Sequence, residues 1–182
     1  GYILVKKKIA ILGSTGSIGK TIFNLILREK KNFEFSLLTA HNSHKILLKQ
    51  AKALNAKNLI ITNKKDYEIL KQKTKNKKIK VFNDFTQLDK IFKKKIDYVM
   101  SSISGIQGLE PTIKIIKFTK KIAIANKESI ICGWNLIQSQ LNKHKTEFIP
   151  VDSEHFSIWY GLKNYKSKDL EKIFLTASGG PF

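Results

Sequence analysis

Residues 8–19 read KIAILGSTGSIG, and the fold class can be predicted from this stretch. The apolar run at 8–12 is typical of a buried strand in a parallel sheet. Glycines at 13, 16 and 19 follow it, and apolar residues then recur at helical spacing, at Ile18, Ile22, Leu25 and Ile26. The order of strand, glycine turn and helix predicts a phosphate-binding turn.

Glycine suits such a turn because a residue without a Cβ adopts unusual dihedral angles and lets a pyrophosphate approach the free N–H groups of the helix. Ser14, Thr15 and Ser17 add hydroxyl donors. The spacing is G-x-x-G-x-x-G rather than G-x-G-x-x-G, so a purely structural tight turn is the alternative. We expect the segment to bind a dinucleotide.

The end of the second expected strand, at residues 33–40, indicates which dinucleotide is bound. An NAD site usually places Asp or Glu there, to hold the ribose 2′-hydroxyl. Residues 39–44 instead read Thr-Ala-His-Asn-Ser-His, without a carboxylate and with two imidazoles that can become cationic. This favours NADP over NAD. Capping of the next helix explains His41 or His44, taken singly, about equally well.

Composition limits the class of protein. The 182 residues suffice for one α/β domain and the beginning of another, and the 42% hydrophobic content argues against a mainly disordered chain. No apolar run is long enough to cross a bilayer, so we expect a soluble protein without a membrane partner. The single cysteine, Cys132, fits a reducing cytosol and is expected to pack in the interior.

The net charge of +20 raises the possibility of a nucleic-acid partner. Among the 34 basic residues, however, only Arg28 is an arginine, and nucleic-acid sites depend on arginine for bidentate and stacking contacts. The lysines are spread along the whole chain. We therefore expect a solvated lysine-rich surface, with a nucleic-acid binder as an alternative.

Strand and helix patterns alternate along the rest of the chain, which predicts crossover helices and a parallel sheet. Strands are expected at 58–62, 81–82, 98–100, 121–125, 146–151 and 172–176. Helices are expected at 45–54, around 67–70, and at 85–92, 106–118 and 129–141. The fold class is α/β, a Rossmann-like, doubly wound, mostly parallel sheet with helices on both faces.

Polar residues follow several of these strands, at the edge where open α/β sheets bind ligands. Residues 101–105 and 126–129 are two such segments. Helix capping explains Asn126 and Glu128 as well as a ligand does, but gives Lys127 no role.

Two carboxylates, Asp152 and Glu154, come directly after the strand at 146–151. Two positions apart on an extended segment, they point to the same side and offer oxygen ligands to Mg²⁺ or Mn²⁺. From these residues alone, helix capping by Asp152 or Ser153 is favoured over a metal site. The Ser178 to Gly180 segment is either an anion cradle or a plain loop.

Taken together, four segments resemble the 1-deoxy-D-xylulose 5-phosphate reductoisomerase family: GSTGSIG at 13–19, ANKES at 125–129, VDSEH at 151–155 and SGGPF at 178–182. The resemblance implies NADPH- and metal-dependent isomerisation and reduction of 1-deoxy-D-xylulose 5-phosphate to 2-C-methyl-D-erythritol 4-phosphate, in the non-mevalonate isoprenoid pathway. It implies an NADPH-binding domain at 1–149 and the beginning of an α+β catalytic domain at 150–182. A homodimeric enzyme of the bacterial cytoplasm is implied, with a plastid-type organelle as the alternative location.

The resemblance also implies roles for single residues. NADPH would contact Thr15, Gly16, Ser17, Ile18, Ala40, His41, Asn42, Asn126 and Glu128. The sugar phosphate substrate would contact Lys127, Ser153, Glu154 and Ser178, and Mg²⁺ or Mn²⁺ would be held by Asp152 and Glu154. Ala40 and His41 stand where the family has glycine and lysine, which weakens the assignment of His41. Because the family's catalytic domain continues further, we expect this chain to bind NADPH but to be inactive alone. A non-catalytic NADP-binding module is the alternative.

Overall fold

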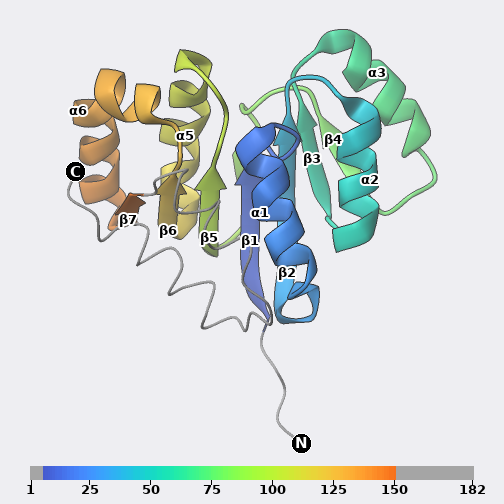
Figure 1. The fold of residues 1–182 in the computed structure, drawn as a ribbon, viewed down its shortest axis with the longest axis horizontal. Helices are drawn as coiled ribbons and strands as arrows, with labels where there is room; N and C mark the ends of the chain where they lie inside the picture. The colour runs from blue at the N-terminus through green and yellow to red at the C-terminus, as the bar shows by residue number, and fades with distance from the viewer. Residues whose placement is uncertain (1–5, 151–182) are drawn as a thin grey trace, which may run out of the picture.

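The computed structural model describes residues 6–150, and a seven-stranded sheet runs through this part of the chain (Figure 1). Every pairing in the sheet is parallel, in the order β4-β3-β2-β1-β5-β6-β7. The strands are β1 (Lys7–Leu12), β2 (Phe33–Ala40), β3 (Asn58–Ile61), β4 (Lys80–Phe82), β5 (Ile96–Ser101), β6 (Thr119–Ile124) and β7 (Glu147–Pro150). The predicted Rossmann-like architecture is confirmed.

Helices cover both faces of the sheet, because successive side chains of a strand point to opposite faces. Ile9 and Ile11 of β1 pack into one hydrophobic core, whereas Ala10 and Leu12 pack into the other. The first core is closed by α1 (Ser17–Leu27), α2 (His44–Leu54) and α3 (Lys64–Lys73). The second is closed by α4 (Leu88–Ile91), α5 (Leu109–Ile115) and α6 (Lys127–His144). Three 3₁₀ turns are η1 (Lys30–Asn32), η2 (Ile106–Gly108) and η3 (Ile116–Phe118).

The strand order reverses at β1. The chain runs outward from β1 to β4 on one side, and then returns so that β5 pairs with the other edge of β1. In open parallel sheets, ligands bind in the crevice outside the carboxyl ends of the two strands at such a reversal. The topology therefore predicts a ligand site between the segments that follow β1 and β5.

Two helix predictions need correction. The helix expected at 85–92 is reduced to α4, because the carboxylate of Asp84 accepts hydrogen bonds from the N–H and hydroxyl of Thr86, at 2.9 and 2.6 Å, and holds a turn. The helix expected at 106–118 is divided into η2, α5 and η3. Cys132, expected in the interior, is exposed on α6. The strand expected at 172–176 lies outside the described residues.

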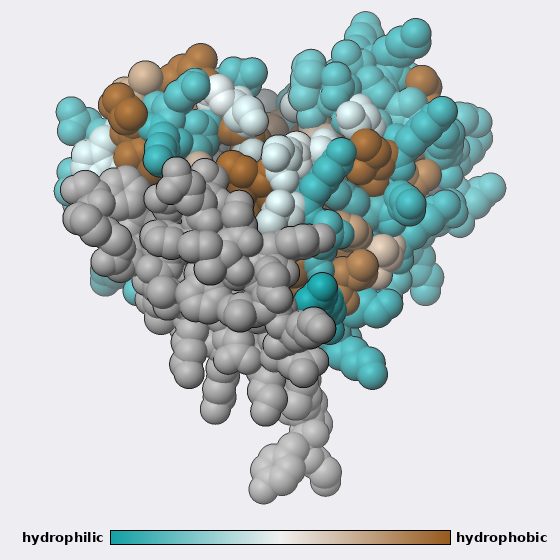
Figure 2. All heavy atoms as spheres, viewed as in Figure 1, coloured by the Kyte–Doolittle hydropathy of each residue, from teal (hydrophilic) through white to brown (hydrophobic). Residues whose placement is uncertain are grey.

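In Figure 2, hydrophilic residues cover most of the visible surface over α2 and α3. Among residues 6–150, no helix has the length and apolar character that crossing a membrane requires.

Candidate functional site

The glycine turn is held between the ends of two other strands. Gly13 follows β1 with a φ of +76°, a conformation that favours glycine. Its N–H donates to Thr39 Oγ1 of β2 at 3.0 Å, and the next N–H, of Ser14, donates to the Thr39 carbonyl at 2.9 Å. On the other side, a Cβ on Gly13 would lie 2.9 Å from the backbone nitrogen of Ile103, which follows β5. A side chain at Gly13 would therefore push the β1 and β5 ends apart.

The first turn of α1 offers backbone donors. The helix begins at Ser17, and its N-cap residue Gly16 makes no side-chain capping bond. Lys20 donates the first helical bond, to the carbonyl of Gly16 at 2.8 Å, which leaves the N–H groups of residues 17–19 unused by the helix. These N–H groups and the helix dipole attract an anion. The start of α1 therefore has free N–H groups, which the prediction of a phosphate-binding turn requires.

The Ser14 hydroxyl, expected as a donor to the ligand, is used inside the protein. Ser14 is fully buried and donates from Oγ to Oε1 of Gln50 at 2.8 Å. Gln50 is 3% exposed on α2 and returns a bond from Nε2 to the Ser14 carbonyl at 2.9 Å. This pair ties the turn to α2. Sequence reasoning missed Gln50 because a single glutamine in an amphipathic helix carries no distinguishing pattern.

A cavity of about 730 Å³ lies at the carboxyl ends of the central strands. Five residues predicted to bind the cofactor line it, namely Thr15, Gly16, Ala40, His41 and Asn42. Sequence reasoning did not assign a further set that also lines it: Thr39, Thr62, Asp84, Phe85, Thr86, Gln107, Glu110, Pro111 and Lys114. Gly13 of the turn and Ser102, Ile103 and Ser104, within the polar segment suspected after β5, also line it. Ser17 and Ile18 are in the first turn of α1 and are not part of this lining.

The two imidazoles after β2 have different partners. His41 lines the cavity, and its Nδ1 lies 2.7 Å from Thr62 Oγ1. His44 is the first residue of α2, and its Nδ1 lies 2.5 Å from a carboxylate oxygen of Asp66 on α3. Residues 39–44 contain no carboxylate, but in the folded chain the carboxylate of Asp66 lies beside His44. The hydrogen bond with His44 lowers the pKa of Asp66, against the effect of burial.

This lowered pKa predicts a pH-dependent stability. Since the folded-state pKa lies below the ordinary 3.8, the pair stabilises the fold above that pH, and the contribution is lost as the pH falls through the lowered value. At pH 7, Asp66→Asn should lower the midpoint of thermal unfolding by about 1–3 °C. The effect is small because the His44–Asp66 pair is partly exposed to solvent.

A pH series of thermal unfolding, down to about pH 3, checks the expectation, because the difference between Asp66→Asn and the parent should shrink in acid. Asp89→Asn, at an exposed aspartate of α4, controls for removing one negative charge from a chain of net charge +20. If the difference in unfolding midpoint between Asp66→Asn and the parent stays constant across the pH series, the pH-dependent stabilisation does not come from Asp66.

Asn126, predicted to face the cofactor, caps α6. Its Oδ1 accepts from the N–H groups of Glu128 and Ser129, at 3.0 and 3.3 Å. Its Nδ2 donates to the carbonyls of Ile103 and Gly105, so Asn126 also holds the segment after β5. Asn126 is buried behind the cavity wall and is not among its lining residues. Lys127 and Glu128 are exposed in the first turn of α6, outside that lining.

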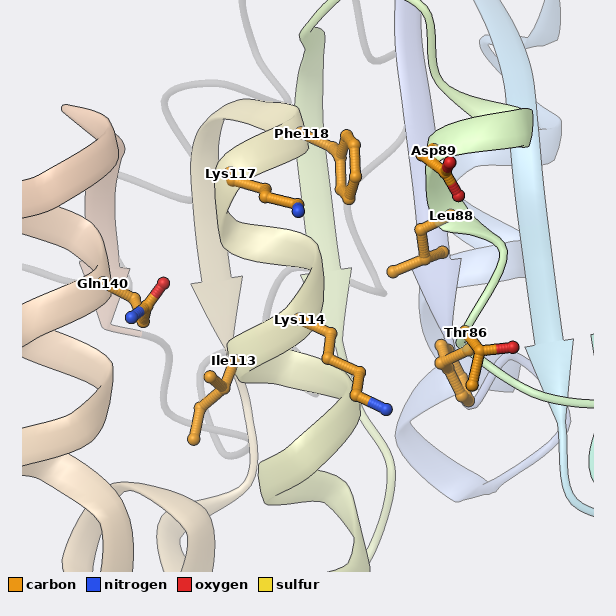
Figure 3. Close-up of a pocket in the computed structure, with 9 residues that line it drawn as sticks. Thr86, Leu88, Asp89, Ile113, Lys114, Lys117, Phe118 and Gln140 are labelled. Carbon is orange, nitrogen blue, oxygen red and sulfur yellow. The ribbon is translucent and has the colours of Figure 1, made fainter.

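A second hollow, of about 640 Å³, lies between α4 and the α5–η3 segment (Figure 3). It carries Lys117, whose ammonium group lies 5.0 Å from the centre of the Phe118 ring, and it shares Lys114 with the first cavity. No residue of the glycine turn lines it. The first cavity, which the turn and the β2 loop enter, is therefore the candidate cofactor site.

Four predicted site residues lie outside the described residues: Asp152, Ser153, Glu154 and Ser178. Between residues 6 and 150, the structure contains no group of three or more histidine, cysteine, aspartate or glutamate side chains that could hold a metal ion. The predicted metal site at Asp152 and Glu154 therefore remains a prediction.

Two family models match the chain. The model described as 1-deoxy-D-xylulose 5-phosphate reductoisomerase matches residues 9–133, and the model of its C-terminal domain matches residues 148–182. The enzyme of that name from Pelagibacter ubique (strain HTCC1062) is 58% identical over 178 residues, which is 97% of this chain and 46% of the relative. The one from Wolbachia pipientis wMel is 41% identical over 177 residues, 97% of this chain and 45% of the relative. The chain thus spans about half the length of these relatives.

Solved structures agree with the family match. The Zymomonas mobilis reductoisomerase in complex with NADPH superposes with a TM-score of 0.74 and 33% identity, over 82% of this chain and 40% of that one. A DOX-P reductoisomerase in complex with NADPH, fosmidomycin and magnesium gives a TM-score of 0.74 and 28% identity, over 82% of this chain and 37% of that one.

Proposed function

Because the chain belongs to the 1-deoxy-D-xylulose 5-phosphate reductoisomerase family, we propose that it binds NADPH in the cavity at the ends of β1, β2 and β5. The observation that carries this proposal is the glycine turn, whose helix presents unused N–H groups next to that cavity. The family's reaction follows as part of the proposal: isomerisation and reduction of 1-deoxy-D-xylulose 5-phosphate to 2-C-methyl-D-erythritol 4-phosphate.

Different residues around the cavity are proposed to contact different parts of the cofactor. Residues 15–18 are proposed to contact the pyrophosphate, which the free N–H groups of Ser17 and Ile18 at the start of α1 suit. Ala40, His41 and Asn42, at the end of β2, are proposed to contact the adenosine ribose and its 2′-phosphate. Asn126 supports the wall through its bonds to residues 103 and 105, and Glu128 is proposed to lie on the nicotinamide side.

The catalytic assignment rests on Lys127, in the first turn of α6, and on residues beyond Pro150. We propose that Asp152 and Glu154 hold Mg²⁺ or Mn²⁺, and that Lys127, Ser153, Glu154 and Ser178 bind the substrate. When bound, NADPH supplies the hydride and the metal ion supplies a Lewis acid. The Lys127 ammonium group supplies positive charge where a substrate oxygen gains negative charge, and Ser178 anchors the phosphate away from the reacting carbons.

The division into domains is proposed at residues 149 and 150. The NADPH-binding part is assigned to 1–149 and the beginning of the catalytic domain to 150–182, which the separation of the two family models between residues 133 and 148 supports. A homodimer and a location in the bacterial cytoplasm are further parts of the proposal. The bacterial sources of the relatives support that location.

A fluorescence titration with NADPH and with NADH tests the cofactor assignment. In about 0.15 M salt, which screens the surface charge, we expect NADPH to bind at least about tenfold more tightly than NADH. The reason is that the β2 end offers donors and an imidazole where an NAD site has a carboxylate.

Equal binding of both nucleotides would contradict the NADPH preference. Binding of neither, with a circular dichroism spectrum typical of an α/β fold, would overturn the cofactor site. Association with nucleic acid that weakens steeply with salt would then favour the nucleic-acid alternative.

A further inference from the structure

The middle of α6 carries no charge, unlike the other helices between residues 6 and 150. Residues 129–142 contain no charged side chain, whereas α1 to α5 each include at least one lysine. Ile131, Cys132, Asn135 and Leu136 are exposed in this stretch, and these four side chains are here called the α6 face. In a chain of net charge +20, a helix surface without lysine indicates contact with protein rather than with water.

The α6 face exposes large apolar side chains. Ile131 is 80% exposed and Leu136 is 60% exposed, more than any other large hydrophobic residue among residues 6–150. Figure 2 shows hydrophobic residues on the visible surface over α6. Exposed apolar surface of this kind is unfavourable in water and marks contact sites. The α6 face is therefore expected to be covered by another apolar surface.

The chain leaves β7 beside this face. Because α6 follows β6, its first turn lies at the carboxyl edge of the sheet, and β7, which is parallel to β6, ends at the same edge. The ring of Trp134 on α6 packs against that of Phe148 on β7, with the ring centres 5.1 Å apart. Residues 151–155 can span up to about 17 Å when extended, and a helix with its side chains is about 10–12 Å wide. The residues from 156 onward can therefore reach the α6 face.

We propose that residues 156–162 of the same chain dock on the α6 face. They read FSIWYGL, with five apolar or aromatic side chains and no charge. Both partners of the contact are thus uncharged segments of a lysine-rich chain. Docking would hold both ends of residues 151–155, which include Asp152 and Glu154, beside the first turn of α6. The inference goes beyond the proposed function and requires no bound cofactor.

A contact within the chain is favoured over a contact between two chains. Because residue 156 is tethered within reach of α6, its effective concentration at the α6 face is on the order of millimolar. A second copy would have to reach the same face by diffusion, at the much lower concentration of the protein itself. The two kinds of contact therefore differ in how they depend on protein concentration.

The thiol of Cys132 reports whether the α6 face is covered, because it lies on that face and is the single cysteine of the chain. The test measures its rate of alkylation by iodoacetamide, an uncharged reagent, in the whole chain at fixed pH. We expect the double variant Phe156→Ser, Trp159→Ser to react at least about tenfold faster than the parent, because loss of the two rings releases the segment. Leu136→Ser should accelerate the reaction from the other side of the contact. Circular dichroism checks that each variant is folded.

Phe182→Ser, at an aromatic position outside residues 156–162, is the matched control and should react as the parent does. Equal rates in the parent and the double variant, or an equal acceleration by Phe182→Ser, would overturn the proposal. Protection that increases between about 1 and 100 µM protein would also overturn it, because a second copy would then cover the α6 face. Cys132 and Leu136 are not among the residues that line the cofactor cavity. Failure of the parent to bind NADPH would therefore overturn the proposed function and leave this inference standing.

Discussion

Replacing Gly19 by alanine is expected to abolish NADPH binding and to destabilise the fold by about 3 kcal/mol or more, the upper range for overpacking. A Cβ at this position would lie 2.1 Å from the carbonyl oxygen of Gly13 and 2.7 Å from two backbone atoms of Ser14. These are backbone atoms of the glycine turn, so they cannot rotate away as a flexible side chain could. The clash would separate the turn from α1.

Helix propensity alone predicts that Gly19→Ala stabilises the fold. Within a helix, replacing glycine by alanine normally raises the free energy of unfolding by about 1 kcal/mol, which is opposite to the result expected here. Urea unfolding measures the change in the free energy of unfolding, and a fluorescence titration should show NADPH affinity reduced more than about 100-fold.

Gly16→Ala is the matched control for stability. Gly16 has a φ of −75°, and its added Cβ would lie 3.7 Å from the Gly13 carbonyl, an ordinary contact. Because alanine is a poorer N-cap than glycine, we expect its free energy of unfolding to fall by no more than about 1 kcal/mol. If Gly19→Ala proves as stable as Gly16→Ala, the close packing of the turn on α1 is wrong.

Asn126→Ala is expected to cost about 2–4 kcal/mol of folding free energy and to weaken NADPH binding. Losing the N-cap of α6 accounts for about 1 kcal/mol. The rest arises because the carbonyls of Ile103 and Gly105 lose their amide donor. Because Ile103 lines the cavity, a wall without this support should hold the cofactor less well. Chemical denaturation and the NADPH titration measure the two effects.

Asn126→Ser separates the two roles. Serine can cap the helix, but it has no amide group to donate to the two carbonyls. It should therefore recover about 1 kcal/mol of the lost folding free energy and little of the cofactor affinity. A change below about 0.5 kcal/mol for Asn126→Ala would show that these bonds do not stabilise the segment after β5.

Much of the candidate site could be predicted because its main elements are local. The apolar run, the three glycines and the helical repeat that follows lie within about twenty consecutive residues, and each depends on short-range steric and periodic effects. The second strand was predicted at the bounds that the structure shows, Phe33–Ala40. The helix expected at 85–92 is shortened to Leu88–Ile91, because the Asp84 carboxylate accepts hydrogen bonds from the N–H and hydroxyl of Thr86 and so competes with the backbone there.

By itself, the sequence determined the class of fold, the position of the glycine turn and the family. It did so because hydrophobic periodicity and turn chemistry act over a few residues, and the family motifs can be read one after another along the chain.

Only the tertiary structure decided which polar side chains meet. Ser14 bonds to Gln50 across 36 positions, and His44 meets Asp66 across 22. These contacts depend on the order in which the strands pair and on how α2 and α3 pack against the sheet. In the fold with this strand order, His41 lines the cavity and His44 does not. No local pattern distinguishes the two imidazoles, because their difference lies in partners that are distant along the chain.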